Sequence, residues 1–238
     1  MLDPQLLEAF AFGFFGYGNP DAPIWFVGLE ESGGKTLEDA QRRMLTWARR
    51  GKRTFEDVAD YHRELNDQTR FDSNPTIQPT WGKLIRLQLA FQGIRNVTVE
   101  TVRDYQQTIL GRENCNELLI ELYPLPSPGK NIWRYNEFSP LRWLADRAAY
   151  QQYLFEYRTQ SISKFIGGHR PAAVVFYCKT EKQSWQTIAD THFEENKELD
   201  ILVSKKAKTV FVVSKHPVSV GVSNGYFEQI GTYLRSNP

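Results

Sequence analysis

The fold is decided by residues 23–34, which read PIWFVGLEESGG. The first half is an apolar run behind a proline, long enough for a buried strand and too short for a helix. The run breaks at Gly28, and two acids and two glycines follow before a segment of helical character. In open α/β sheets, ligands bind at the carboxyl ends of the strands. We therefore expect Glu30 and Glu31 to lie at a ligand-binding edge.

Three further apolar runs have the length of buried strands, at residues 117–123, 171–177 and 209–213. Helical spacing of apolar residues predicts helices over residues 4–15, 36–50, 54–65, 80–91, 141–165, 181–190 and 226–234. Proline, glycine and polar residues predict turns or loops at residues 16–20, 66–79 and 127–136. Buried strands separated by helices require a mainly parallel sheet with helices on both faces. We predict one α/β domain over residues 1–238.

Composition excludes several classes of protein. The chain is 41% hydrophobic with a formal net charge of +1, so it has a sizeable core and no global basic field. The two cysteines, Cys115 and Cys178, cannot supply a disulfide framework or the four thiolates of an iron–sulphur cluster. No apolar run reaches the length of a membrane span, and residues 1–16 lack the features of a signal peptide. We expect a soluble, cytoplasmic protein without metal, cofactor or membrane partner, and the oligomeric state stays open.

Polar groups follow each predicted strand, and parallel strands gather their carboxyl ends at one edge of the sheet. These groups are Glu30, Glu31, Glu121, Tyr123, Cys178, Lys179, Thr180, Ser214, Lys215, His216 and Ser219. A carboxylate, a histidine and hydroxyls on one rim form an acid–base constellation. Glu121 stands inside an apolar run, where an acid is costly unless it is paired or faces a pocket. The sequence offers Lys179, Lys215 and Arg134 as its partners.

Residues 28–36 also resemble a phosphate-binding loop, since they end in Gly34-Lys35-Thr36 directly after a strand. That loop has four residues between its first glycine and its Gly-Lys-Thr, whereas five separate Gly28 from Gly34. The two acids would also repel phosphate oxygens, and no later strand ends in an obvious magnesium-binding aspartate. Spacing and charge therefore argue against a nucleoside triphosphate site.

Three short motifs, taken in order, resemble the uracil-DNA glycosylase superfamily. They lie at residues 18–28, 119–126 and 212–219, and the last contains His216-Pro217. The resemblance covers about residues 17–234. It implies a three-layer α/β/α fold with a central four-stranded parallel sheet.

The resemblance also implies roles for individual residues. Glu30 matches the residue that positions or activates a water for attack on the sugar C1′, and His216 matches the histidine that stabilises the departing base. The target base would be flipped into the pocket, with Val218 or a neighbouring valine wedged into the duplex.

Three positions depart from the family's pattern. Glu31 stands where the family has proline, the last motif is one residue longer before Ser219, and Glu121 stands where uracil-specific members have asparagine. An ionised carboxylate only accepts hydrogen bonds. We therefore expect Glu121 to favour an exocyclic amine or a protonated base edge over the O4 of uracil.

Two functions stay open at this point. The first is a DNA-repair hydrolase that cleaves the N-glycosidic bond of a flipped-out altered base other than plain uracil. The second is a catalytically inactive protein of the same fold that binds a nucleobase, a nucleotide or nucleic acid. The catalytic candidates are Glu30 and His216. The substrate-binding candidates are Gly28, Glu31, Glu121, Tyr123 and Ser219, and the candidates for nucleic-acid contact are Lys179, Lys215 and Val218.

Two groups of side chains have open roles. The basic cluster forms either a phosphate-binding surface or a solvated helix face, and its members are Arg42, Arg43, Arg49, Arg50, Lys52 and Arg53. Three aromatic residues are candidates for stacking on a base: Trp47, Phe71 and Trp81.

Overall fold

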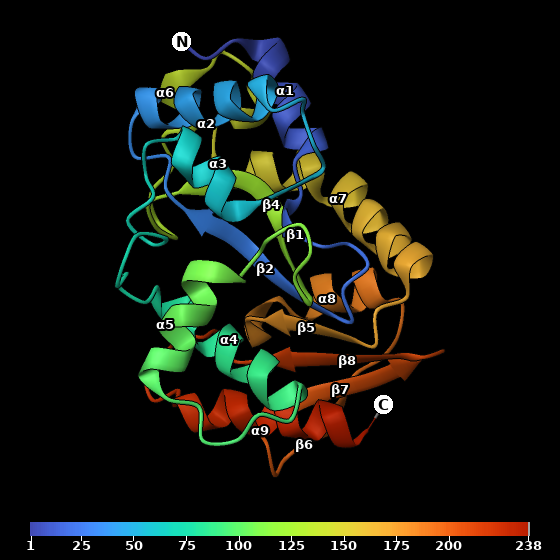
Figure 1. Ribbon diagram of the computed structural model, residues 1–238. Helices are drawn as coiled ribbons and strands as arrows, with labels where there is room; N and C mark the ends of the chain where they lie inside the picture. Colours follow the sequence, from blue (N-terminus) through green and yellow to red (C-terminus); the bar gives the residue numbers. More distant parts are fainter. Residues whose placement is uncertain (238) are drawn as a thin grey trace.

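The computed structural model describes residues 1–237 as an α/β fold built around a twisted sheet (Figure 1). The predicted strands are present as β2 (Ile24–Ser32), β4 (Glu117–Ser127), β5 (Ala173–Tyr177) and β8 (Thr209–Ser214). They are neighbours in the order β4-β2-β5-β8, and each pairs with the next in parallel. Their carboxyl ends therefore meet at one edge, as the sequence predicts.

The sheet is larger than the four-stranded parallel sheet expected from the sequence. Over the described residues it has eight strands and is mixed, in the order β3-β1-β4-β2-β5-β8-β7-β6. On one side, β1 (Gly16–Gly18) pairs antiparallel with β4, and β3 (Phe55–Glu56) pairs with β1. On the other side, β7 (Ile201–Lys206) pairs antiparallel with β8, and β6 (Glu194–Asn196) pairs with β7. These additions are short or polar, so they lack the apolar run by which buried strands are recognised.

Strand β1 corrects the turn that was expected at residues 16–20. Gly16 has φ +147°, and a Cβ built on it would lie 1.9 Å from the carbonyl oxygen of Leu119 on β4. Gly16 therefore permits the close approach of two backbones, which is one of the reasons why glycine occurs in strands.

Helices cover both faces of the sheet, because side chains of each central strand alternate between two cores. On β2, Trp25 and Val27 enter one core, and Ile24 and Phe26 enter the other. The first core is closed by α1 (Pro4–Gly13), α2 (Leu37–Arg49), α3 (Val58–Glu64), α6 (Tyr135–Phe138), α7 (Arg147–His169) and α8 (Lys182–Ala189). The second is closed by α4 (Pro79–Phe91), α5 (Val99–Thr108) and α9 (Asn224–Ser236) (Figure 1).

Two boundaries differ from the sequence prediction in ways that shape the site. Strand β4 does not stop at Pro124 but runs on to Ser127, with a shift of register against β2 between Glu30 and Ser32. Prolines donate no backbone hydrogen bond and are tolerated at such irregularities.

The predicted helix 141–165 is divided. A 3₁₀ turn covers Arg142–Leu144, and α7 begins at Arg147, where the Asp146 side chain accepts a hydrogen bond from the backbone N–H of Ala149 at 2.8 Å.

Helix α5 was not predicted. In the described part of the chain, no helix combines the length and the apolar character needed to cross a membrane.

The substitution Gly16→Ala tests the close approach of β1 to β4. The new methyl group would overlap the Leu119 carbonyl oxygen, so we expect the free energy of unfolding to fall by about 2–3 kcal/mol. Urea unfolding measures the change. Gly167→Ala is the matched control, since no atom lies within 4 Å of a Cβ built at this position of α7. An equal effect of the two substitutions would contradict the role given to Gly16.

Candidate active site

A cleft of about 680 Å³ opens at the carboxyl edge of the parallel strands. Five of the predicted site residues line it: Glu30, Glu31, Glu121, His216 and Val218. The opposite wall comes from α2, α3, the loop before α4 and the first turn of α4. Parallel pairing of β4, β2, β5 and β8 thus brings Glu30 and His216, which are 186 positions apart in the sequence, into one cleft.

Glu30 is held by Arg147, which the sequence analysis did not single out. Arg147 forms an ion pair with Oε1 of Glu30 and also donates hydrogen bonds to the Ser127 hydroxyl at 2.5 Å, to the Gly129 carbonyl at 2.9 Å and to the Ile132 carbonyl at 2.8 Å. Burial raises the pKa of Glu30, and Arg147 opposes that rise. Oε2 of Glu30 is shielded from solvent and has no hydrogen-bond partner among the described residues. One oxygen is therefore fixed and the other is free to act.

Glu31 belongs to a different network. Its Oε2 accepts a hydrogen bond from the Tyr17 hydroxyl at 3.3 Å and lies 3.7 Å from Nη1 of Arg43. Arg43 is held in turn by Asp39, with 3.2 Å between Nε and Oδ1. Adjacent acids on β2 therefore have separate cations and separate surroundings.

The basic cluster is largely engaged inside the protein. Arg43 serves the cleft, Arg50 pairs with the buried Glu56 at 2.9 Å, and Arg53 pairs with Glu113. For these three arginines, the contacts favour neither a phosphate-binding surface nor a solvated helix face, because each guanidinium already has an acidic partner.

Glu121 reaches across the middle strand to Tyr177, whose hydroxyl donates to Oε1 at 3.0 Å. Gly28 lies between them, opposite Glu121 in the register of β2 and β4. A Cβ built on Gly28 would lie 2.1 Å from the Tyr177 hydroxyl oxygen and 2.4 Å from Oε2 of Glu121. Only glycine at this position lets the side chains of β4 and β5 meet over β2.

The ionisation expected of Glu121 is corrected by its surroundings. Burial raises the pKa of Glu121 well above its usual range, nearby Glu31 raises it further, and the hydrogen bond from Tyr177 only partly opposes the rise. The carboxyl therefore keeps its proton at a pH where an exposed glutamate is ionised. Its Oε2 is shielded from solvent and has no partner among residues 1–237.

The cationic partners suggested by the sequence for Glu121 are used elsewhere. Lys179 and Lys215 both form ion pairs with Asp200, and Arg134 pairs with Glu137 at 3.1 Å. Neither lysine lines the cleft. The two lysines join the ends of β5 and β8 to the segment before β7.

His216 lies beside Tyr177, with ring centroids 5.8 Å apart in an edge-to-face arrangement. Burial lowers the pKa of His216, so the neutral ring is favoured. The backbone N–H of Val218 donates to Nδ1 at 3.4 Å, so Nδ1 is the acceptor and the hydrogen of the neutral ring is on Nε2. The ring thus offers a neutral hydrogen-bond donor to a ligand.

The loop that carries His216 is fixed by Lys83 of α4, a second residue without a signal in the sequence. Its Nζ donates to the carbonyl oxygens of Pro217 at 2.7 Å and Val222 at 2.6 Å. Between these two anchors, the side chains of Val218 and Val220 are exposed.

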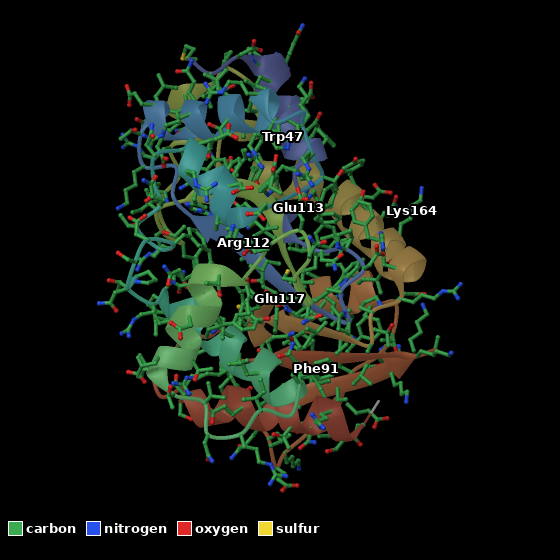
Figure 2. All side chains as sticks on the ribbon, viewed as in Figure 1. Trp47, Phe91, Arg112, Glu113, Glu117 and Lys164 are labelled. Atoms are coloured by element: carbon green, nitrogen blue, oxygen red, sulfur yellow. The ribbon has the colours of Figure 1, made fainter. Side chains whose placement is uncertain are left out.

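Aromatic rings form part of the opposite wall. Trp81, at the start of α4, lines the cleft, and its ring lies 5.8 Å from that of Phe71 and 6.3 Å from that of His62. The third stacking candidate, Trp47 (labelled in Figure 2), is instead buried in the core, and the centroid of its ring lies 5.2 Å from that of Phe10. Trp81 is therefore the ring available to a ligand.

Other predicted positions lie outside the lining of the cleft. Tyr123 is buried, and its ring lies 5.6 Å from that of Tyr150. Ser219 is exposed in the loop after His216, where its backbone N–H donates to the His216 carbonyl at 3.0 Å.

The loop after β2 does not present free amides to a phosphate. The backbone N–H of Gly34 donates to Oδ2 of Asp39 at 2.8 Å, so this amide is already occupied. Within residues 1–237, no three His, Cys, Asp or Glu side chains are grouped so that they would hold a metal ion.

No protein-family model matches the chain, and a search among curated proteins finds no match. Inference about function therefore depends on the geometry of the cleft and on the three motifs noted in the sequence.

The substitution Glu121→Gln tests the protonation of Glu121. Because the folded state raises this pKa, the group favours folding below the unfolded-state pKa, and this contribution is lost as the pH rises through the folded-state value. An amide does not titrate. We expect the stability of the variant relative to the wild type to increase as the pH rises above the usual range of a glutamate, by on the order of 1 kcal/mol for each pH unit over which Glu121 is protonated in the folded state and ionised in the unfolded state.

Urea unfolding at several pH values measures this difference. Glu137→Gln is the control, because Glu137 is an exposed glutamate paired with Arg134. A difference between Glu121→Gln and the wild type that stays constant with pH would show that Glu121 is ionised in the folded protein.

Proposed function

We propose that the protein is a DNA glycosylase-like hydrolase, which cleaves the N-glycosidic bond of an altered base flipped out of DNA into the cleft. The observation that carries the proposal is a half-buried carboxylate with one free oxygen, Glu30, in the same cleft as a neutral histidine, His216. The adjacent parallel strands with helices on both faces, and the three motifs, support a uracil-DNA glycosylase-like fold.

Glu30 acts on the attacking water. Arg147 fixes Oε1, and Oε2 accepts the proton of a water that attacks the sugar C1′. Burial makes the carboxylate a stronger base, and Arg147 keeps enough of it ionised to act. The negative charge also stabilises the positive charge that develops on the sugar as its bond to the base breaks.

His216 acts on the leaving base. When the bond from C1′ to the base nitrogen breaks, its electron pair goes to the base, and Nε2–H of His216 donates a hydrogen bond to the developing anion. The departing base then takes its proton from solvent. A ring with a lowered pKa serves this role without needing to be protonated first.

The remaining walls suit an extruded nucleotide. Trp81 offers a face for base stacking, which contributes roughly 1–3 kcal/mol per base in proteins that bind single strands. The exposed Val218 and Val220 lie on the loop fixed by Lys83, where they are positioned to fill the gap that the extruded base leaves in the duplex.

A panel of duplex oligonucleotides with uracil, hypoxanthine, xanthine and other altered bases tests the proposed reaction. We expect cleavage of at least one base, and a rate reduced roughly 10²- to 10³-fold by Glu30→Gln and by His216→Ala. Glu137→Gln and His192→Ala are matched controls, because both residues lie outside the cleft and are exposed. Release of the base and formation of alkali-labile sites measure the rate.

Cleavage of no base by the wild type, or cleavage that neither substitution affects, would contradict the proposed hydrolysis. Binding of a damaged duplex without cleavage would favour the alternative of an inactive binding protein.

The substitution Arg147→Gln tests the link between Arg147 and Glu30. Arg147 lowers the pKa of Glu30, so its removal raises that pKa and leaves less carboxylate at neutral pH. We expect the acid limb of the pH–rate profile to move to higher pH, with activity that recovers as the pH rises. Arg134→Gln is the control, because Arg134 pairs with Glu137 outside the cleft. A loss of activity that is equal at every pH would mean that Arg147 supports the structure only.

A further inference from the structure

Glu121 is the polar group of the cleft that the proposed reaction leaves unused. Glu121 lines the cleft together with Glu30 and His216, yet its Oε2 has no hydrogen-bond partner among the described residues. A shielded polar atom without a partner is destabilising, and such atoms are rare in native proteins. A ligand in the cleft would supply the missing partner.

The hydrogen bond from Tyr177 determines which oxygen carries the proton. Its hydroxyl donates to Oε1 of Glu121 at 3.0 Å, so Oε1 acts as the carbonyl oxygen. When the carboxyl is neutral, its hydrogen is then on Oε2. The unpartnered atom is consequently a donor, and it needs an acceptor.

The charges around the carboxyl favour the neutral form. Glu31 and Glu30 face it from β2, and both disfavour a further negative charge. Arg158 of α7 attracts a negative charge, but its guanidinium is occupied by backbone carbonyls, including that of Glu121 at 2.6 Å. Tyr177 on β5 supplies one hydrogen bond. Burial and the two acids raise the pKa of Glu121 by more than the hydrogen bond from Tyr177 and the positive charge of Arg158 lower it.

We propose that Glu121, oriented by Tyr177 across Gly28, reads the edge of the bound base as a protonated acid that donates from Oε2 to a carbonyl oxygen of the base. The inference rests on the proposed function, and it makes Glu121 a specificity-determining residue. It reverses the expectation from the sequence, in which an ionised Glu121 accepts a hydrogen bond from an amine.

The reversal has a direct chemical consequence. An exocyclic amine set against Oε2–H would oppose two donors, whereas a carbonyl at the same position satisfies the orphaned hydrogen. Hypoxanthine and adenine differ in this way at the same ring position and have nearly the same shape. As the pH rises and Glu121 ionises, the donor is lost and the preference for the carbonyl base falls with it.

Fluorescence anisotropy with duplexes that carry one 2′-fluoro nucleotide tests the proposal, since the fluorine slows loss of the base. One duplex carries 2′-fluoro-deoxyinosine and the other 2′-fluoro-deoxyadenosine at the same position. We expect the wild type to prefer the inosine duplex roughly 10- to 100-fold at about pH 6, and the preference to shrink toward about pH 9.

Two variants distinguish hydrogen-bond donation by the protonated carboxyl from an effect of side-chain shape. Glu121→Gln keeps an oxygen for the Tyr177 hydroxyl and places a non-titrating donor near the position of Oε2, so it should keep the preference across the pH range. Glu121→Leu has neither group and should lose the preference at every pH. His216 is present in both variants, so its own titration is common to all the curves.

A wild-type preference for the adenosine duplex, or the same pH dependence in the wild type and in Glu121→Gln, would overturn the proposal. Base-selective binding without cleavage of the ordinary nucleotides would contradict the hydrolysis but leave the reading role supported. Cleavage with a selectivity that neither Glu121 variant alters would support the hydrolysis and overturn the reading role.

Discussion

The absence of a side chain at Gly28 is the constraint on which the cleft depends. Parallel strands β4, β2 and β5 bring Glu121 and Tyr177 to either side of this residue, and both side chains turn over it to form a hydrogen bond. A methyl group there would overlap both of them. The glycine that ends the apolar run on β2 thus also makes room for the hydrogen bond between Glu121 and Tyr177.

Three carboxyl groups share one cleft, and different neighbours act on the pKa values of two of them, Glu30 and Glu121. Glu30 forms an ion pair with Arg147 and Glu31 with Arg43, whereas the carboxyl of Glu121 accepts a hydrogen bond from the neutral hydroxyl of Tyr177 and forms no ion pair among the described residues. Environments that separate the pKa values of nearby acids are what assign base and acid roles in enzymes. Glu30 is consequently suited to accept a proton, and Glu121 to keep one.

How far the sequence predicts the molecule depends on how local each signal is. Continuous apolar runs identify the four central strands, and helical spacing identifies most helices, because both signals lie within a few residues. The edge strands are short, polar or rich in glycine, so β1 reads as a turn from sequence alone. Proline near residue 124 likewise suggests an end to β4, whereas an irregular register against β2 lets the strand continue.

Local sequence signals predict less of the candidate site than of the fold. Glu30 and His216 could be placed in one cleft because each follows a strand in a recognisable motif. Arg147 could not be assigned to Glu30 from sequence, since 117 positions separate them and many arginines compete for the same acid. The raised pKa of Glu121 could not be predicted from sequence, because it depends on burial and on neighbours from other elements, which the residue type does not reveal.

The protonation states of Glu30 and Glu121 also depend on each other. Negative charge on Glu30 raises the pKa of Glu121, so ionisation of Glu30 helps to keep Glu121 neutral. Of the three acids, Glu30 is the one with which Arg147 forms an ion pair, whereas Glu31 pairs with Arg43. Arg147 therefore favours the ionised form of Glu30 without removing the field that Glu121 experiences from Glu31. The proposed reaction requires Glu30 to be ionised while Glu121 is protonated. Both conditions can hold at the same pH because Glu30 has the ion pair with Arg147, whereas the side-chain partner of Glu121 is the neutral Tyr177.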